Sequence, residues 1–363
     1  MIRRYEQDDL DRVAGVLATG RLGQLPDGHV RALGREFADV VGARHGIPRN
    51  SNLTALSQVL MLAGAASAEV ICDPLVQYGA VAALSVGATP VFVDVRADTY
   101  NLDERLLDAA LSDRTRAVVV THLWGQCADM PAIVETCRGR EVLVVEDCAH
   151  SVGSTWADQH SGTFGDVGVF SFNQHKQIST GDGGLVVTDH DWIHEQLTNE
   201  WPSGESPGFL TLNYRMTEVV AALGIGQLRR VPEYLRAYDS ARHELDTMLG
   251  EVPWLRHRTT PEAAVRSPYW WAALWTGDHN SFTDFAQQVD RLGTEAGCRF
   301  TRKPAPEYPI FASAQVAGGT LPVAQAILER VVHIPLVELG VSEAAALATA
   351  IRAIGEQTWQ PPS

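Results

Sequence analysis

The sequence predicts an α/β protein, with a large three-layer domain built on a mostly parallel sheet and a smaller C-terminal α+β domain. Two observations predict this fold. From about residue 30 to 190, short runs rich in β-branched residues alternate with helix-length segments, which is typical of a parallel sheet covered by helices on both faces. After about residue 240 this alternation stops, and aromatic-rich strand and helix patterns replace it.

The individual elements follow from the same patterns. Apolar runs predict strands at 70–72, 91–95, 117–120, 142–145, 167–170 and 185–187. Helical patterns fill the intervals at 53–65, 79–87, 103–111 and 130–137, and a longer helix is expected at 217–249. Beyond it we expect a strand at 269–275 and helices at 282–296 and 342–354. The chain should therefore divide into a large domain (1–239) and a small α+β domain (240–363).

Composition and charge narrow the classes of function. The chain has 363 residues, of which 45% are hydrophobic and 20% charged, and its formal net charge is −15. Because no basic stripe offsets this charge, no nucleic-acid partner is expected. No apolar run of about 18 residues and no signal-like N-terminus is found, so we expect a cytoplasmic protein without a membrane partner. The five cysteines and the histidines lack metal-ligand spacing, so we predict reduced thiols and no metal.

Three segments together predict a cofactor site. Val144-Val145-Glu146-Asp147 places a carboxylate at the end of an expected strand, where ligands of parallel sheets bind. Phe170-Ser171-Phe172-Asn173-Gln174-His175-Lys176 places a hydroxyl and then a lysine after another strand. The glycine-rich turn Thr180-Gly181-Asp182-Gly183-Gly184 follows. These groups suit pyridoxal phosphate, which needs a lysine for its aldehyde, a carboxylate for its pyridine nitrogen and a hydroxyl for its phosphate.

Each residue also has an ordinary structural interpretation. Most lysines are solvated surface charges, so Lys176 gains a catalytic interpretation only from its neighbours in the sequence. The alternative for Asp147 is a turn cap, and for His150 and Tyr78 it is a place in the core. In the functional interpretation, Asp147 pairs with the pyridine nitrogen and His150 reaches the phenolic oxygen. Tyr78 would then stack on the cofactor ring.

The segment Arg49-Asn50-Ser51-Asn52-Leu53-Thr54 is polar and then apolar, as at the start of a helix. Either it is only an N-cap, or the phosphate rests on free backbone N–H groups at this helix end, around Asn52 and Leu53. A dinucleotide-binding fingerprint is excluded, because no G-x-G-x-x-G follows an expected strand.

Over residues 20–240 the chain resembles the DegT/DnrJ/StrS family of fold-type-I pyridoxal-phosphate aminotransferases, which act on keto-sugars and cyclitols. The segments that carry the resemblance, in order, include Gly87-Ala88-Thr89-Pro90-Val91, His122-Leu123-Trp124-Gly125-Gln126, Glu146-Asp147-Cys148-Ala149-His150, Phe170-Ser171-Phe172 to Lys176 and Asn213-Tyr214-Arg215-Met216-Thr217-Glu218. The resemblance makes Lys176 the Schiff-base lysine, Asp147 the ring-nitrogen partner and Ser171 a phosphate ligand. It also implies that Asn213 reaches the phosphate of a neighbouring subunit's cofactor, in a homodimer with shared active sites.

The chain departs from the family pattern at three places. Ser51-Asn52-Leu53 stands where the family usually has Ser-Gly-Thr, so phosphate binding is left to backbone N–H groups, Ser171 or Thr54. Asp182 replaces the usual glutamate of the glycine-rich turn, and Asn173 replaces the histidine that commonly precedes the lysine.

The function implied by the resemblance is transfer of an amino group from glutamate or glutamine to a ketone on a sugar, cyclitol or nucleoside-like intermediate in natural-product or amino-sugar biosynthesis. A same-fold deoxysugar dehydratase is the first alternative, although those relatives carry histidine in place of Lys176. A non-catalytic scaffold or regulator that binds the cofactor is the second. Seven residues that flank the site in sequence are expected to bind acceptor hydroxyls or a ring face: His122, Trp124, Gln126, Asn173, Gln174, His175 and Asp182. The alternative is that several of them only pair with one another or with the backbone.

Overall fold

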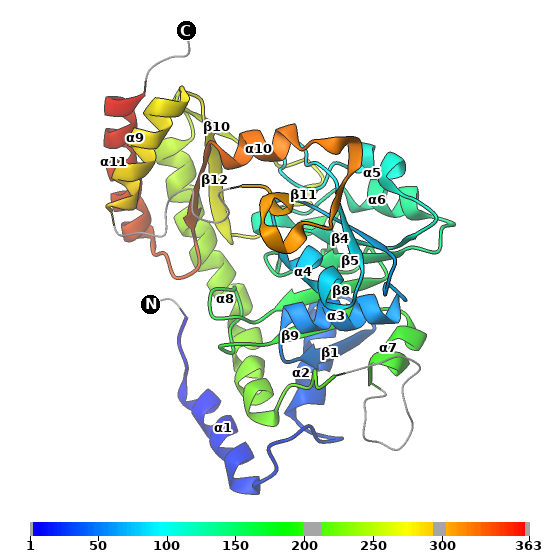
Figure 1. Cartoon of the computed structure of the whole chain (residues 1–363). Helices are drawn as coiled ribbons and strands as arrows, with labels where there is room; N and C mark the ends of the chain where they lie inside the picture. The colour runs from blue at the N-terminus through cyan, green and yellow to red at the C-terminus, as the bar shows by residue number, and fades with distance from the viewer. Residues whose placement is uncertain (1–2, 199–211, 293–302, 360–363) are drawn as a thin grey trace.

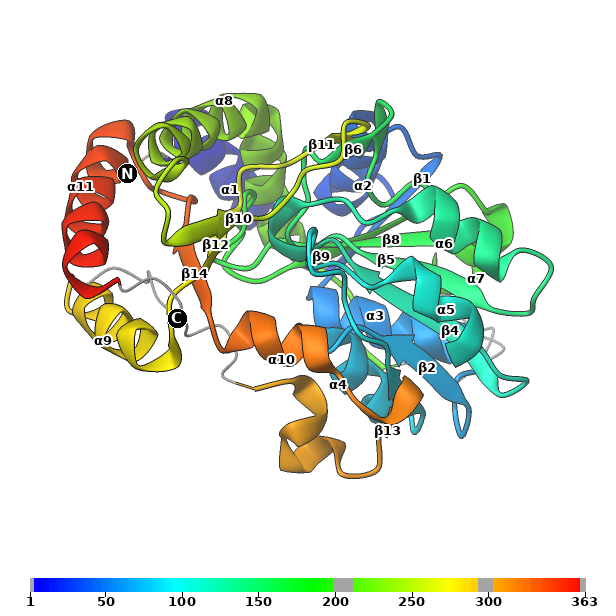
Figure 2. The ribbon, with the colours of Figure 1, turned by 90° about the horizontal axis from the view of Figure 1, so that it is seen from above.

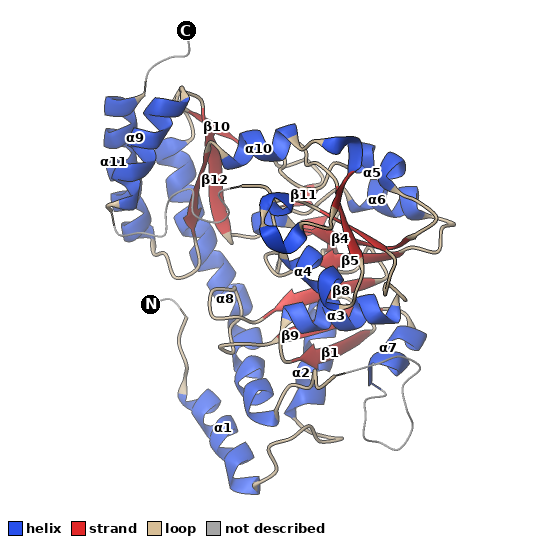
Figure 3. Ribbon diagram, viewed as in Figure 1, coloured by secondary structure: helices blue, strands red, loops and turns tan. Residues whose placement is uncertain are grey.

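A computed structural model describes residues 3–198, 212–292 and 303–359, and it confirms the mixed α/β architecture with a large, mostly parallel sheet (Figures 1 and 3). The strands of this sheet are β1 (His45–Arg49), β2 (Glu69–Cys72), β3 (Thr89–Phe92), β4 (Thr115–Thr121), β5 (Leu143–Asp147), β8 (Val167–Ser171), β9 (Gly184–Thr188) and β13 (Gln315–Val316). Their order across the described part of the chain is β1-β9-β8-β5-β4-β2-β3-β13. The central pairs from β3 to β8 are parallel, and β9 runs antiparallel to both of its neighbours.

Helices cover both faces of the sheet because successive residues of each strand are apolar and point to opposite sides. Val70 and Cys72 of β2 pack in one core with α3 (Asn52–Leu62), α4 (Tyr78–Ser85) and α7 (Asp191–Thr198). Ile71, between them, packs in a second core with α5 (Glu104–Ala110) and α6 (Met130–Cys137). A third core joins β8 and β9 to α2 (His29–Val41).

The long helix α8 (Glu218–Leu249) runs from the large sheet into the C-terminal part of the molecule (Figure 1). A small sheet there has the order β10-β12-β14, with β10 (Leu255–His257), β12 (Trp270–Trp275) and β14 (Val331–Pro335). Helices α9 (His279–Asp290) and α11 (Val341–Thr358) lie beside it, away from the large sheet (Figure 2). Their apolar side chains share a core with those of the small sheet and the second half of α8.

Strand β12 joins the two parts of the molecule. Its residues alternate, so that Trp271 and Trp275 enter the core of the small sheet while Ala272 and Leu274 enter the core of the large one. Later segments also return to the large sheet, since α10 (Pro322–Leu328) packs there and β13 pairs with β3. The expected boundary at 239/240 falls inside α8, whose buried side chains up to Val231 belong to a large-domain core and from Tyr234 onward to the small-domain core. The division into 1–239 and 240–363 stays a prediction.

Most expected elements are found within a few residues of their predicted bounds, and the differences have local causes. Strand β1 lies outside the predicted strands, and its Pro48 is tolerated because β1 is an edge strand. Helix α9 begins before the expected residue 282 because Asp278 caps it, accepting a hydrogen bond from the Ser281 N–H at 2.7 Å. The predicted end of that helix, at 296, lies outside the described residues.

The remaining elements are short or peripheral. They are α1 (Gln7–Thr19), the strands β6 (Thr155–Trp156), β7 (Gln159–His160) and β11 (Ala264–Val265), and single turns of 3₁₀ helix at Leu123–Gly125, Ala305–Glu307, Pro309–Phe311 and Ala317–Gly319. No helix in the described ranges is both long and apolar enough to span a membrane.

Candidate active site

The residues expected to hold the cofactor gather at a cavity of about 800 Å³. Six of the eight line it directly: Asn52, Leu53, Tyr78, His150, Ser171 and Lys176. They come from the start of α3, the start of α4 and the segments that follow β5 and β8, so the cavity lies at the carboxyl ends of the parallel strands. The fold thus brings these six residues together, although their segments are spread over more than half of the large domain.

Lys176 lies in the turn after β8, where its backbone N–H donates to the carbonyl oxygen of Asn173 at 3.0 Å. Its Nζ donates to the hydroxyl oxygen of Tyr269 at 3.0 Å and lies 4.9 Å from the centre of that ring. Burial lowers the pKa of Lys176 from 10.5 to about 8, although the carboxylate of Asp147 opposes the shift. A substantial fraction of the amine is then neutral near pH 7–8, which is the form that attacks an aldehyde.

Asp147 is the last residue of β5 and is only 1% exposed. Its Oδ1 accepts hydrogen bonds from the Asn52 side chain and from the Ala149 N–H, both at 3.1 Å. Its Oδ2 is buried and has no hydrogen-bond partner among the described residues. Burial raises the pKa of Asp147, while these two hydrogen bonds and the charge of Lys176 act against the rise. A buried carboxylate oxygen without a donor fits a protonated ring nitrogen such as that of pyridoxal phosphate.

His150 follows β5 in a buried turn, where its ring stacks on Tyr269 with centroids 4.5 Å apart. Its Nδ1 accepts a hydrogen bond from the Trp124 N–H at 3.4 Å. Burial, aided by the charges of Lys176 and Arg258, lowers the pKa of His150 well below 6.5. The ring is therefore neutral at physiological pH with its proton on Nε2, which makes Nε2 a hydrogen-bond donor.

The start of α3 forms the end of the cavity that suits an anion. The Ser51 hydroxyl accepts from the Thr54 N–H at 3.2 Å, whereas no side-chain cap reaches the N–H groups of Asn52 and Leu53 among the described residues. The Thr54 hydroxyl donates to Ser51 O at 3.1 Å and also bonds Asn50, and Thr54 does not line the cavity. Of the hydroxyls considered for the phosphate, Ser171 is the one at the cavity.

Two expected residues occupy exposed positions. Tyr78, the first residue of α4, is 52% exposed although it lines the cavity, as suits a side chain that covers a ligand. Asn213 is exposed and does not line the cavity of its own chain. Its Oδ1 accepts from the Arg215 N–H at 3.2 Å, and its carbonyl oxygen accepts from Asn50 at 3.1 Å. The role expected for Asn213 in a neighbouring subunit's site stays a prediction.

Sequence reasoning missed several residues that contact the lysine segment or line the cavity. Trp270 is the first residue of β12 in the small sheet and Tyr269 directly precedes it. Trp270 stacks on His333 at a centroid distance of 4.5 Å. Arg3 is buried and donates to the carbonyl oxygens of Gln174, at 2.8 Å, and Lys176. The aromatic run at 269–271 was the available signal for the first two. No local pattern indicates Arg3, which lies more than 170 positions before the loop that it contacts.

The expected acceptor-binding residues divide into two groups. Asn173, Gln174, His175 and Asp182 line the cavity. The prediction was wrong for the other three, His122, Trp124 and Gln126, which are at most 1% exposed and do not line it. These three residues follow β4, and the chain turns inward there, so that hydrogen bonds and ring contacts within the core occupy their side chains.

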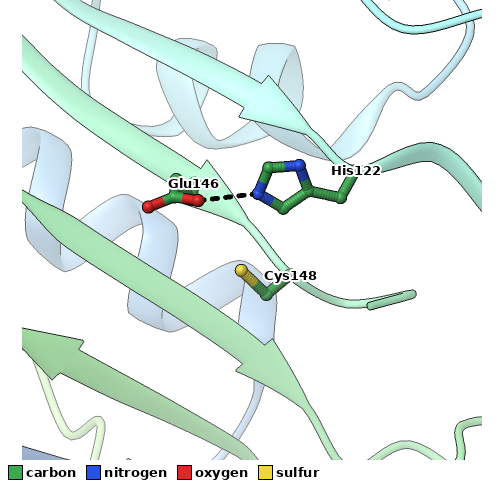
Figure 4. A group of neighbouring side chains, drawn as sticks. All are labelled: His122, Glu146 and Cys148. Carbon is green, nitrogen blue, oxygen red and sulfur yellow. Dashed lines mark hydrogen bonds and ion pairs between the residues drawn. The ribbon is translucent and has the colours of Figure 1, made fainter. Parts of the chain in front are cut away.

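The inward turn brings His122 together with Glu146 and Cys148, whose ligand atoms lie within 4.8 Å of one another (Figure 4). No spacing of residues along the chain indicates this cluster. His122 Nε2 bonds Glu146 at 2.8 Å, and its Nδ1 accepts from the Ala128 N–H at 3.1 Å. The Glu146 carboxylate also accepts from three backbone N–H groups, those of residues 162, 164 and 165. Because these atoms already have partners, a structural hydrogen-bond network is favoured over a metal site.

A mostly parallel sheet with a buried lysine in a cavity at its carboxyl edge is typical of α/β enzymes that attach a cofactor through a lysine. The family model of the DegT/DnrJ/EryC1/StrS aminotransferase family matches residues 4–351, and the chain therefore belongs to that family. The GDP-perosamine synthase of Caulobacter vibrioides is 35% identical over 275 residues, which are 72% of this chain and 73% of that protein.

Two further proteins extend the comparison. The L-glutamine:2-deoxy-scyllo-inosose aminotransferase of Streptomyces kanamyceticus is 28% identical over 311 residues, covering 79% of this chain and 73% of that one. The crystal structure of the aminotransferase TlmJ from Streptoalloteichus hindustanus superposes with a TM-score of 0.87, at 28% identity, over 98% of this chain and 97% of that one.

Proposed function

We propose that the chain is a pyridoxal-phosphate-dependent aminotransferase that moves an amino group from glutamate or glutamine to a ketone on a sugar, a cyclitol or a nucleoside-like intermediate. One observation carries the assignment of cofactor. Lys176, whose pKa is lowered to about 8, lines a cavity together with Asn52 and Ala149. Those two residues donate to the buried Asp147 directly behind this wall, and its Oδ2 has no partner among the described residues. Bound there, the cofactor supplies an electron-withdrawing ring that acidifies the Cα–H of an attached amine.

The surrounding residues have distinct roles in holding the cofactor. Lys176 would attach its aldehyde, and Asp147 would pair with the ring nitrogen and keep it protonated. His150 would donate from Nε2 to the phenolic oxygen, and Tyr78 would cover the ring face. The N–H groups of Asn52 and Leu53, together with the Ser171 hydroxyl, would bind the phosphate.

Lys176 would have a second role with the cofactor bound. Its amine would act as general base and acid, moving a proton from the donor's Cα to the adjoining cofactor carbon. Its pKa of about 8 suits this task, because both protonation states are populated near neutral pH. Tyr269, whose hydroxyl accepts from Nζ at 3.0 Å, would hold this amine in place.

The acceptor class rests on the relatives and on the cavity wall. One relative is named for perosamine synthesis and another for transfer from L-glutamine to 2-deoxy-scyllo-inosose. The cavity itself presents Asn173, Gln174, His175 and Asp182, which can hydrogen-bond hydroxyls. Trp270 adds a flat aromatic wall. A site built on hydroxyl hydrogen bonds discriminates against acceptors without them, since its polar groups are then left unpaired.

Amino transfer to a panel of acceptors tests this proposal. Keto-sugars and inososes should accept the amine from glutamine or glutamate, and branched-chain or aromatic keto acids should be poor acceptors at equal donor concentration. A clear preference for the apolar keto acids would overturn the acceptor class and leave the cofactor assignment standing. A chain that binds the cofactor but is unchanged by either donor would instead support the scaffold alternative. Lys176 itself disfavours the dehydratase alternative, whose representatives carry histidine there.

A further inference from the structure

Asn52 makes a contact that its place in the sequence did not suggest. It is the first residue of α3, at the position where the family pattern usually has glycine, and it is 7% exposed. Its side-chain amide donates to Asp147 Oδ1 at 3.1 Å and to the carbonyl oxygen of Val169 at 3.2 Å. Both amide hydrogens are therefore used, one on the end of β5 and the other on β8, the strand beside it.

These two hydrogen bonds restrict the carboxylate. Asp147 and Val169 are partners in the register of the two parallel strands, so the Asn52 amide spans two fixed points of the sheet. Together with the Ala149 N–H, it gives Oδ1 two donors, whereas Oδ2 has none among the described residues. Rotation of the carboxylate about its Cβ–Cγ bond would break both bonds to Oδ1. The donors therefore leave Oδ2 as the carboxylate oxygen whose hydrogen-bonding capacity is unused among the described residues.

The helix start can lie this close to the sheet because of Gly184, the first residue of β9. A Cβ built on Gly184 would lie 2.5 Å from the Ser51 carbonyl carbon and 2.6 Å from the Asn52 nitrogen. Any larger residue would push the start of α3 away from the strands. The absence of a side chain at Gly184 therefore lets the Asn52 amide come within hydrogen-bond distance of Asp147.

We propose that Asn52 is a positioning residue that fixes the orientation of Asp147 and so directs Oδ2 toward the ring nitrogen of the cofactor. This inference rests on the proposed function, because it requires pyridoxal phosphate to bind at Asp147. Asn52 then has a role beyond its backbone N–H. Its side chain, which replaces the family's usual glycine, holds Asp147, and Asp147 keeps the ring nitrogen protonated. The amide also stabilises the ionised carboxylate, since a donor to an anion favours the charged form.

The direct test measures cofactor binding by the full chain rather than turnover. Equilibrium binding of pyridoxal phosphate and of pyridoxamine phosphate is followed by fluorescence in wild type, Asn52→Gly and Asn52→Leu. Glycine restores the family's usual residue, and leucine keeps the branched shape of asparagine without its donors, in a somewhat larger side chain. Both variants should bind the cofactor about 10- to 100-fold more weakly, the range for a hydrogen bond to a charged group. A pH titration of the bound cofactor's absorption band should show that its ring nitrogen loses its proton at a lower pH in the two variants than in wild type.

A double-mutant cycle separates positioning from a general loss of structure. In the Asp147→Asn background, Asn52→Leu should change cofactor affinity by less than about threefold, because the charge that it supports is already gone. Ser57→Ala is the matched control. Ser57 is equally buried, at 7% exposed, lies on the same helix and donates to Leu53 O at 3.0 Å, so its loss should lower stability without changing the cofactor's titration.

Each result decides something different. Wild-type affinity and titration in both Asn52 variants would overturn the inference and leave the proposed function in place. Equal losses with and without Asp147→Asn would also overturn it, because Asn52 would then act on the helix and not through the carboxylate. Failure of the wild-type chain to bind the cofactor would overturn the proposed function itself. A variant that misfolds is identified by circular dichroism, and the other one then carries the test.

Discussion

The Nζ of Lys176 lies 3.0 Å from the hydroxyl of Tyr269, although 93 positions separate the two residues in the sequence. The same tyrosine stacks on His150, so one side chain at the start of the small sheet contacts two residues of the large-domain site. Tyr269 also packs in the core of the large sheet. The small sheet is therefore part of the active-site wall, and displacing it relative to the large sheet would alter the surroundings of the lysine.

The chain contains only two lysines, Lys176 and Lys303, which makes the attachment point unusually simple to test. After incubation with pyridoxal phosphate and borohydride, peptide mapping should find the reduced cofactor on Lys176. Lys176→Ala should remove the label and all turnover, whereas Lys303→Ala should change neither. Lys303 is the natural control because its Nζ bonds the carbonyl oxygen of Glu307 at 2.7 Å, away from the cavity. Label on Lys303 in the wild-type chain would contradict the assignment.

The pH dependence of Lys176 should differ from that of an ordinary lysine. Burial lowers its pKa to about 8, so the reactive neutral amine increases about tenfold per pH unit below 8 and then levels off. The rate at which the apo chain reacts with an aldehyde at Lys176, measured by stopped-flow absorbance, should follow that curve. An ordinary lysine would continue to gain rate up to pH ~10.4. A rate that keeps rising at pH values well above 8 would contradict a lowered pKa for Lys176.

Asp147→Asn should leave the fold intact but slow removal of the donor's Cα proton by orders of magnitude. The amide cannot balance a charged ring nitrogen, and an uncharged ring withdraws electrons poorly. Single-turnover absorbance with glutamate or glutamine measures this step directly. A rate within about tenfold of wild type, or ~1.4 kcal/mol in the barrier, would make Asp147 a structural residue only.

Glu146→Gln should destabilise the fold without changing the cofactor site. The Glu146 carboxylate accepts from His122 and from three backbone N–H groups. In the glutamine variant one of the two oxygens becomes an NH₂ group, whose hydrogens would face some of these donors. Removing the charged acceptor of these buried donors costs about 1–3 kcal/mol, so the urea midpoint should fall at unchanged slope. A chelator should leave the melting temperature of the wild-type chain unaltered. A large drop on chelation would instead indicate that the cluster of Figure 4 holds a metal.

The shared-site prediction can be tested by mixing two inactive variants. Lys176→Ala chains and Asn213→Asp chains should each be weak alone, the second because a carboxylate would repel phosphate. If Asn213 serves the neighbouring subunit, hybrid dimers should regain one site with both native residues. Subunit exchange is verified by native mass spectrometry of differently tagged chains. Hybrids that form but gain no activity would contradict a shared site.

Local chemistry made much of this protein predictable from sequence. Apolar runs of strand length had to be buried on both faces, and the carboxyl ends of parallel strands share one edge. The amino-acid pattern alone therefore predicts that Asp147 and Ser171 lie near Lys176. The error at His122 has the same origin. Sequence proximity to the site indicates nearness but not the side to which a side chain points, and the turn after β4 directs His122 inward to Glu146.

Only the tertiary structure decided which distant groups complete the site. The sequence determined the layered fold, the lysine, the carboxylate and the glycine-rich turn, because periodicity and strand ends are local properties of the chain. It could not indicate that Tyr269 touches Lys176, that Arg3 holds the lysine loop, or that the side chain of Asn52 bonds Asp147. Those contacts depend on how β12, the N-terminal segment and α3 pack against the sheet, and packing is fixed by the whole core rather than by any one segment.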